Sequence, residues 1–313
     1  MNVTILGCGA YGTALAVMFK ENNCNIKMWN KFDNNFDMLR IELSDVIFTT
    51  SMEDSVNNTD LIVIAIPLAY LEDTVKELSG FYDNQDILIA SKGIDTENGL
   101  FASEILKKYI NCKNIGAISG GTFAIDMKDK KVMGITLGSK SDIIKNKVKN
   151  MLENKYLKVQ YCNDILGVQI CGSVKNIMAI GFGILDGANY PESSRFLFLT
   201  EAIYEINYLI KSLGGDNDTI LSYAGIDDIA MTCTSSKSRN YTMGKLIGSG
   251  ESIDNINKYK EETTVEGVGS ALGINTLCSD RNINLNMCKI IYDILYNNAN
   301  YKELIDYLIN KRN

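Results

Sequence analysis

One lysine in the second half of the chain has the surroundings of a catalytic acid or base. Lys175 is the only charged residue between Ile165 and Leu185. Burial among apolar residues disfavours the ammonium form and lowers the pKa of a lysine, so that its amine can exchange a proton near neutral pH. The alternative is a lysine whose amine reaches solvent. The apolar, Gly- and Ser-containing surroundings favour the catalytic role.

The same stretch is long enough to cross a membrane, which takes about 20 mostly apolar residues. Polar residues interrupt its middle, namely Gln169, Ser173 and Asn176. A lysine at the centre of a span costs about 2.5–3.5 kcal/mol on insertion scales. We therefore expect a helix buried in the protein and no membrane span.

The composition removes several classes of chemistry. The chain contains no histidine, which excludes imidazole acid–base catalysis and histidine-ligated zinc, so proton transfer must use Lys, Asp, Glu, Tyr or Cys. With 31 basic and 38 acidic residues the formal net charge is −7, which argues against a nucleic-acid partner. The eight cysteines include no Cys-x-x-Cys pair, and the N-terminus lacks the basic region of a signal peptide. We expect reduced cysteines, no metal and a cytoplasmic location.

A glycine-rich motif near the N-terminus indicates a dinucleotide. Gly7, Gly9 and Gly12 form G-x-G-x-x-G, directly after the apolar run Asn2–Leu6 and before an Ala- and Leu-rich segment. Such glycines permit a tight turn and let backbone N–H groups approach a pyrophosphate at a helix N-terminus. A glycine-rich turn without ligand is the alternative, but the strand–loop–helix context favours cofactor binding.

The end of the next apolar run addresses the choice between NAD and NADP. A carboxylate about 20 positions after the last glycine would bind the ribose 2′-hydroxyl of NAD. Here the run ends Trp29-Asn30-Lys31, and the first carboxylate is Asp33. Lys31 can pair with a 2′-phosphate or be a solvated loop residue. The turn therefore favours NADP, with NAD as the alternative.

Polar residues follow two further apolar runs, at Ser91-Lys92-Gly93 and at Ser119-Gly120-Gly121-Thr122. Ligands of open parallel sheets bind at the carboxyl ends of the strands. Each segment alone is typical of a turn. Together on one edge, Lys92, Gly120 and Thr122 form a candidate site.

A loop in the second half carries hydroxyl groups beside an arginine and an asparagine, in Thr232–Asn240. Arginine binds phosphate through two parallel hydrogen bonds, so the loop is a candidate phosphate site. Its composition also fits a solvated Ser/Thr loop. Asp228, just before it, can pair with a lysine and orient it.

The 313 residues suffice for about two domains. Short apolar runs alternate with amphipathic segments in the first half, which predicts a parallel-rich sheet covered by helices. We assign residues 1–163 to a dinucleotide-binding domain and residues 164–313 to an α-helical substrate-binding and catalytic domain. The predicted strands are Asn2–Leu6, Ile26–Trp29, Leu61–Ile66, Asp86–Ala90, Ile115–Ile118 and Val132–Leu137, and clear helices are Thr13–Glu21, Leu71–Leu78, Arg195–Leu213 and Asn284–Tyr296.

Six segments in order resemble the bacterial-type NAD(P)-dependent glycerol-3-phosphate dehydrogenases along nearly the whole chain. They are GCGAYGTALA from Gly7, SKGI from Ser91, SGGTFA from Ser119, GVQICGSVKNIMAIG from Gly167, DDIAMTCTSSKSRN from Asp227 and TVEG from Thr264. The resemblance implies a Rossmann-like N-terminal domain, an all-α C-terminal domain and an active site in the cleft between them. It implies reversible NAD(P)H-dependent reduction of dihydroxyacetone phosphate to sn-glycerol 3-phosphate, which feeds glycerophospholipid synthesis.

The resemblance also assigns roles to residues. Lys175 would be the general acid and base, held by Asp228, with Lys92 adding positive potential. The substrate site would comprise Lys92, Gly120, Thr122, Asn176, Asp228, Thr232, Ser238, Arg239 and Asn240. The cofactor would contact Gly7, Gly9, Ala10, Tyr11, Gly12, Lys31, Lys92, Ala124, Arg239 and Glu266. No metal is implied.

Two positions depart from the family pattern. Gly121 stands where the family usually has proline, so this loop is less restricted. Tyr241 follows Asn240 where the family often has arginine, which removes a cation near the phosphate. The alternatives are another two-domain β-hydroxyacid or nucleotide-sugar dehydrogenase, and a non-catalytic dinucleotide-sensing module. The expected partner is a small phosphorylated substrate; a homodimer is compatible with the sequence, which leaves the oligomeric state open.

Overall fold

The computed structural model describes residues 1–311, which form two compact units. The first unit comprises Met1–Lys92 and Ala102–Val168, and the second comprises Gly93–Phe101 and the chain from Gln169 onward. The predicted functional division at residues 163/164 stays a prediction. That the short segment Gly93–Phe101 belongs to the second unit was not foreseen.

The first unit contains an eight-stranded sheet in the order β3-β2-β1-β4-β5-β6-β7-β8. Neighbouring strands are parallel except β6 and β7, which are antiparallel. The parallel-rich Rossmann-like architecture predicted from the sequence is therefore confirmed. The strands are β1 (Asn2–Leu6), β2 (Asn25–Trp29), β3 (Ile47–Thr49), β4 (Leu61–Ile64), β5 (Asp86–Ile89), β6 (Ile115–Ser119), β7 (Met133–Gly138) and β8 (Leu157–Cys162).

Two of these strands were not predicted. β3 has only three residues, too few to show a pattern. β8 lies at the end of the sheet, and its first four residues alternate between buried and exposed. Buried parallel strands are continuous apolar runs, whereas a half-covered strand alternates, so β8 lacks the signal that identified the central strands.

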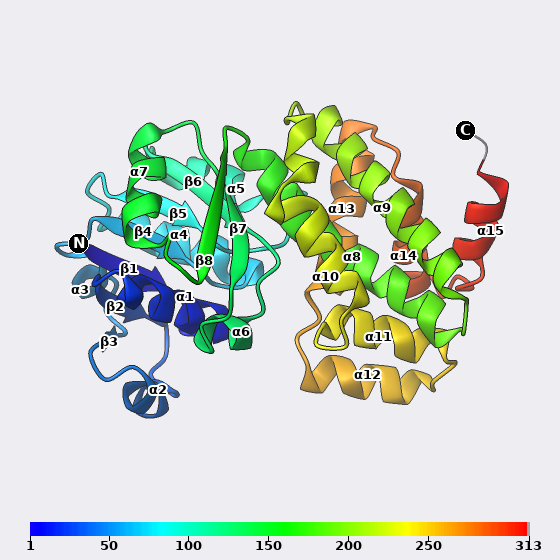
Figure 1. The fold of residues 1–313 in the computed structure, drawn as a ribbon, viewed down its shortest axis with the longest axis horizontal. Coiled ribbons are helices and arrows are strands. Elements are labelled where there is room, and N and C mark those ends of the chain that lie inside the picture. Colours follow the sequence, from blue (N-terminus) through cyan, green and yellow to red (C-terminus); the bar gives the residue numbers. More distant parts are fainter. Residues whose placement is uncertain (312–313) are drawn as a thin grey trace. The chain divides into compact units, whose positions relative to one another are not determined.

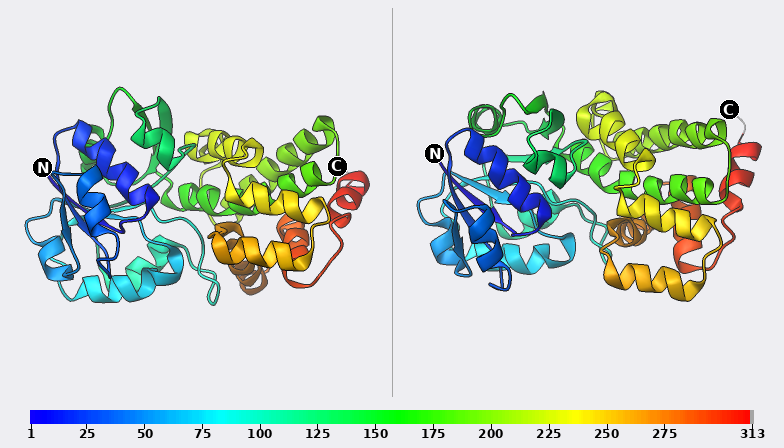
Figure 2. Two further views of the ribbon diagram at one scale, coloured as in Figure 1. Left: turned by 90° about the horizontal axis from the view of Figure 1, so that it is seen from below. Right: turned by 60° about the horizontal axis from the view of Figure 1, so that its bottom comes forward.

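Helices cover both faces of the sheet (Figures 1 and 2). α1 and α6 pack together on one face, and α4 and α5 pack together on the other. The helices of this unit are α1 (Ala10–Glu21), α2 (Phe36–Glu42), α3 (Met52–Val56), α4 (Leu71–Ser79), α5 (Ala102–Tyr109), α6 (Ala124–Lys128) and α7 (Asp142–Met151). α1 begins at Ala10 rather than at the predicted Thr13, because the last glycine of the motif is already helical.

In its described residues the second unit contains helices and connecting loops and no strand, as predicted. It contains most of α8 (Ile165–Gly187), followed by α9 (Glu192–Ser212), α10 (Asp228–Thr234), α11 (Arg239–Gly248), α12 (Ile253–Glu262), α13 (Glu266–Arg281), α14 (Asn286–Tyr296) and α15 (Glu303–Asn310). α9 begins three residues before the predicted Arg195, directly after Pro191.

α8 is the central helix of this unit. It is long and apolar enough to cross a membrane, yet 89% of its most apolar window is buried inside the protein. Its burial is that of a core helix, as expected from the polar residues at its middle.

Glycines allow α8 and α11 to approach each other at backbone distance. A Cβ atom on Gly244 or Gly248 of α11 would lie 2.0 Å from the carbonyl oxygen of Ile180 or Ile184. On α8, a Cβ on Gly183 would lie 2.2 Å from the carbonyl oxygen of Tyr241. The paired positions rise together along both helices, so the two helices run parallel in a fixed register.

We expect Gly248→Ala to destabilise the protein, because its methyl group would have to push two backbones apart. Overpacking of this kind costs about 1–3 kcal/mol. Gly269→Ala in α13 is the matched control, since its Cβ would have no atom nearer than 4.0 Å; alanine there is neutral or stabilises by up to about 1 kcal/mol. Urea unfolding measures both variants, and equal stability of the two would contradict the close helix contact.

Candidate active site

The glycine loop of the first unit connects the end of β1 to the start of α1. Gly7 has a φ of +115°, which L side chains rarely adopt, and a Cβ there would lie 2.4 Å from the carbonyl oxygen of Ala65. A Cβ on Gly12 would lie 2.1 Å from the carbonyl oxygen of Gly7. Both glycines are thus required by the turn itself.

The N-terminus of α1 is free to bind an anion. Its N-cap residue is Gly9, which offers no side-chain hydrogen bond, and no acidic residue lies in the first turn. Unpaired N–H groups and the helix dipole favour a negative group at this position. A Cβ on Gly9 would meet nothing within 4 Å, so this glycine leaves open space at the helix end. The loop fits the pyrophosphate of a dinucleotide.

The end of β2 lies beside this loop. The Gly7 N–H donates to the Trp29 carbonyl at 2.8 Å, and the Cys8 thiol lies 3.7 Å from the same oxygen. Burial raises the pKa of Cys8 to about 12, so this cysteine is not a reactive thiolate. Lys31, two residues after the strand, is exposed. A contact of this lysine with a ribose phosphate stays a prediction.

Three elements bring predicted residues together at the carboxyl edge of the sheet. The Tyr11 hydroxyl of α1 lies 3.4 Å from the Thr122 hydroxyl that follows β6. The Lys92 ammonium, which follows β5, lies 5.3 Å from the centre of the Tyr11 ring. This distance is that of a cation–π contact. Gly120 cannot carry a side chain, because a Cβ would lie 2.4 Å from the Gly134 carbonyl oxygen.

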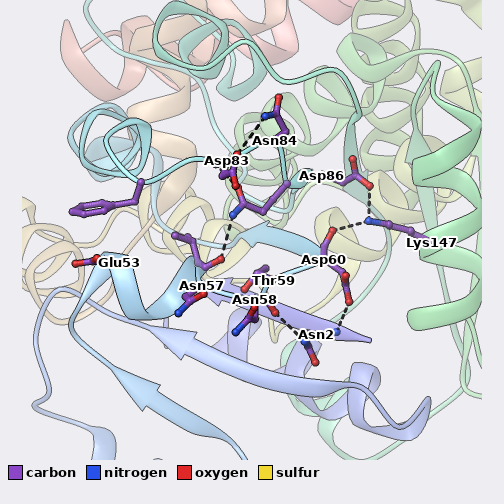
Figure 3. A pocket seen from close by; sticks show the side chains of 13 residues that line it. Asn2, Glu53, Asn57, Asn58, Thr59, Asp60, Asp83, Asn84, Asp86 and Lys147 are labelled. Carbon is purple, nitrogen blue, oxygen red and sulfur yellow. Dashed lines mark hydrogen bonds and ion pairs between the residues drawn. The ribbon is translucent and has the colours of Figure 1, made fainter.

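A polar cavity of about 790 Å³ lies at the opposite edge of the sheet (Figure 3). It is lined by residues at the amino ends of strands, including Asn2, Asp60 and Asp86. Lys147 binds the Asp86 carboxylate at 2.6 Å and the Asp60 carbonyl at 2.7 Å. These polar groups are satisfied by one another, and the cavity contains none of the predicted site residues.

The second unit contains a buried ion pair. The Lys175 ammonium of α8 contacts the Asp228 carboxylate of α10 and donates to the Thr232 hydroxyl at 3.0 Å. The Thr232 hydroxyl also lies 3.2 Å from the Asp228 carboxylate. Lys175 is 6% exposed and Asp228 is fully buried. A buried ion pair adds little net stability because both charges lose their hydration, so its presence favours a chemical role.

A backbone kink directly precedes Asp228. The segment Tyr223–Asp227 contains a kink at Gly225, whose φ and ψ of −87° and −110° are not helical. A Cβ on Gly225 would lie 2.0 Å from the Ile220 carbonyl oxygen.

Two asparagines link α8, α11 and α13. The Asn240 amide donates to the Asn176 side-chain oxygen at 3.0 Å, and the Asn176 amide donates to the Glu266 carboxylate at 3.2 Å. The Gly267 N–H donates to the Asn240 side-chain oxygen at 2.8 Å. Residues far apart in the sequence thus form one hydrogen-bonded chain beside Lys175.

The remaining predicted residues are placed differently. The Ser238 hydroxyl accepts a hydrogen bond from the Tyr241 N–H, so Ser238 is the N-cap of α11. Arg239 is the first residue of that helix and is exposed. Ala124 begins α6 in the first unit. Their roles toward a ligand stay predictions.

Ser173 is a positioning residue that the sequence pattern did not indicate. Its hydroxyl donates to the Gly93 carbonyl at 2.8 Å and accepts from the Gly93 N–H at 3.1 Å. It therefore fixes the residue that follows Lys92. A serine two positions before Lys175 in an apolar helix was the available signal, but its partner is 80 residues away.

Comparisons with known proteins cover both units. Residues 2–144 match the family model of the NAD-dependent glycerol-3-phosphate dehydrogenase N-terminus, and residues 164–306 match that of its C-terminus. The glycerol-3-phosphate dehydrogenase [NAD(P)+] of Staphylococcus haemolyticus is 28% identical over 326 residues, covering 99% of this chain and 98% of the relative.

Solved structures share the fold. The glycerol-3-phosphate dehydrogenase of Coxiella burnetii has a TM-score of 0.92 at 22% identity, with 99% of each chain covered. The enzyme of Saccharomyces cerevisiae has a TM-score of 0.86 at 19% identity, again with 99% of each chain covered.

We expect Gly9→Ala to separate folding from cofactor binding. The added methyl group meets no protein atom, so the free energy of unfolding changes by no more than about 1 kcal/mol, the scale of an N-cap effect. The same methyl group occupies the space through which the backbone approaches a pyrophosphate, so NADPH binding weakens about tenfold or more. Fluorescence titration with NADPH and urea unfolding measure the two quantities.

Gly80→Ala is the matched control. Gly80 also lies at a helix end, and a Cβ there would make an ordinary van der Waals contact, 3.5 Å from the nearest atom. It should bind NADPH as the unaltered protein does. Unchanged NADPH binding by Gly9→Ala would show that the pyrophosphate does not lie at this loop.

Proposed function

The chain belongs to the NAD-dependent glycerol-3-phosphate dehydrogenase family, and from this we propose that it reduces dihydroxyacetone phosphate reversibly to sn-glycerol 3-phosphate with NADH or NADPH. The observation that carries the proposal within the structure is the buried contact of Lys175 with Asp228 and Thr232. The product would feed glycerophospholipid synthesis.

The lysine provides the proton that the reduction needs. When bound, the reduced nicotinamide supplies a hydride to the carbonyl carbon. The Lys175 ammonium donates a hydrogen bond to the carbonyl oxygen and transfers its proton there as negative charge develops, which completes the alcohol. Asp228 and Thr232 hold the amine in place before and after the transfer. In the reverse direction the neutral amine takes the proton back.

The N-terminus of α11 is the proposed phosphate site. Arg239 is exposed at the first position of the helix, and no acidic residue lies in its first turn. The helix dipole and free N–H groups favour a phosphate dianion, and an arginine can bind it through two hydrogen bonds. Asn240, the second residue of α11, is hydrogen-bonded to Asn176, which follows Lys175 on α8. These two asparagines are proposed to contact the hydroxyl groups of the substrate.

The first unit is proposed to hold the cofactor at the glycine loop, with Tyr11, Lys92 and Thr122 at the nicotinamide side. That the active site forms in a cleft between the two halves stays a prediction, as does a homodimer. A cytoplasmic location is supported by the cysteines, which are all free.

We expect Lys175→Arg to lower kcat by about 10²–10⁴, the usual contribution of an acid or base. Arginine keeps the charge opposite Asp228 but does not release its proton in proteins. It is preferable to Lys175→Met, which leaves a buried carboxylate unpaired at a cost of about 3–5 kcal/mol. The assay follows NAD(P)H absorbance with dihydroxyacetone phosphate, and Lys211→Arg, at an exposed lysine of α9, is the control.

The same assay distinguishes the other functions. Turnover of 3-hydroxyacids in place of dihydroxyacetone phosphate would indicate a different dehydrogenase. NADPH binding without turnover of any substrate would indicate a sensing module. Near-normal turnover by Lys175→Arg would remove Lys175 from its proposed role.

Lys31 is proposed to favour NADP. We expect Lys31→Ala to raise KM for NADPH about tenfold, the scale of one lost hydrogen bond to a charged group, and to leave KM for NADH unchanged. Steady-state kinetics with each cofactor measure the difference. An equal response to both cofactors would contradict a contact between Lys31 and the 2′-phosphate.

A further inference from the structure

A cluster of four polar residues lies near the C-terminal end of α8, away from Lys175. The Asp186 carboxylate contacts the Arg195 guanidinium, accepts a hydrogen bond from the Tyr241 hydroxyl at 2.5 Å and binds the Lys245 ammonium at 2.8 Å. We call Asp186, Arg195, Tyr241 and Lys245 the Asp186 cluster. It joins α8, the start of α9 and α11 through a single carboxylate.

The carboxylate at the centre of the cluster is ionised at neutral pH. Burial opposes the charge of Asp186, but hydrogen bonds from Lys245 and Tyr241 and the charge of Arg195 together hold its pKa below the usual value. Hydrogen bonds to an ionised acceptor are stronger than those between neutral groups. The Tyr241 hydroxyl is therefore held firmly.

The Tyr241 ring is held as well as its hydroxyl. Its centre lies 6.5 Å from that of the Phe182 ring of α8, and the Arg195 guanidinium lies 5.9 Å from the Phe182 ring centre. The carbonyl oxygen of Tyr241 lies against Gly183. The ring, the hydroxyl and the backbone of Tyr241 thus all contact α8, at Phe182, Asp186 and Gly183.

Tyr241 lies directly after the segment that is proposed to bind the phosphate. Asn240, one residue earlier, reaches Asn176 on the same α8. The N-cap bond runs from the Tyr241 N–H to the Ser238 hydroxyl. Any movement of Tyr241 along α8 would therefore move Ser238, Arg239 and Asn240 with it.

We propose that Asp186, acting through Tyr241, is a positioning residue that sets the place of Ser238–Asn240 for the phosphate of the substrate; this rests on the proposed function. Tyr241 itself turns toward Asp186 and is not a phosphate ligand. The cluster fixes the C-terminal side of Asn240, while Asn176 fixes its side chain. Displacement of a binding group by even about 1 Å weakens catalysis strongly.

Tyr241→Phe tests the proposal, because it removes only the hydroxyl and leaves the ring on Phe182. We expect KM for dihydroxyacetone phosphate to rise about tenfold, the equivalent of about 1.4 kcal/mol, with KM for NADPH within about twofold of the unaltered enzyme. Tyr161→Phe is the matched control, since the Tyr161 hydroxyl also donates to a carboxylate, that of Glu153, at 3.0 Å in the first unit. It should leave KM for dihydroxyacetone phosphate unchanged.

A second variant tests the path through Asp186. Asp186→Asn weakens the hold on the Tyr241 hydroxyl, so it too should raise KM for dihydroxyacetone phosphate. The double variant should raise KM for dihydroxyacetone phosphate no further than the more affected single variant does. The reason is that Asp186 acts through the Tyr241 hydroxyl, so the two effects are not independent. Equal KM values for Tyr241→Phe and Tyr161→Phe, an equal rise in KM for NADPH, or independent effects in the double variant would each overturn the proposal.

Calorimetric titration with inorganic phosphate separates this proposal from the proposed function. No turnover of dihydroxyacetone phosphate by the unaltered enzyme would refute the proposed function. Weaker phosphate binding by Tyr241→Phe than by Tyr161→Phe would still support the positioning role. Equal binding by the two variants, or no phosphate binding by the unaltered enzyme, would refute it.

Discussion

The buried ion pair of Lys175 with Asp228 is the constraint on which the proposed active site depends. Removing both charges from water costs several kcal/mol per ion, and only close pairing with further hydrogen bonds compensates for that loss. Thr232 supplies such a bond to the lysine. α8 and α10 therefore cannot shift against each other without exposing a buried charge to an apolar core. The same restraint keeps the amine in one place, which is the preorganisation that acid–base catalysis requires.

In both units, glycines let backbone segments pack closely against each other, and this close packing positions polar groups. In the first unit, Gly12 lets α1 begin against the backbone of Gly7 and leaves its N-terminus free for an anion. In the second unit, the glycines of α8 and α11 let these helices meet at backbone distance, so that Asn240 reaches Asn176. In the second unit Lys175, Asn176 and Asn240 are held by regular helices, which limits how far they can move. In the first unit Lys92 and Thr122 follow the ends of strands instead.

Much of the fold could be predicted because buried strands and helices produce recognisable apolar patterns in the sequence. The central strands β1, β4 and β5 are buried along almost their whole length and are mostly apolar, since helices cover both faces of the sheet. β8 was not predicted, because its exposed positions are polar, as at Lys158 and Gln160. The assignment of Gly93–Phe101 to the second unit could not be predicted either. It follows from contacts between distant residues, such as that of Ser173 with Gly93.

For the site, the sequence by itself determined which residue types could transfer a proton and which segment could bind a dinucleotide. It contains no histidine, it isolates Lys175 in an apolar helix, and it supplies the glycine motif before α1. The tertiary structure alone decided which distant residues meet: Asp228 lies 53 positions from Lys175, and Tyr241 lies 55 positions from Asp186. The physical reason is that local sequence sets burial and periodicity, whereas the partner of a buried polar group depends on which backbones pack side by side.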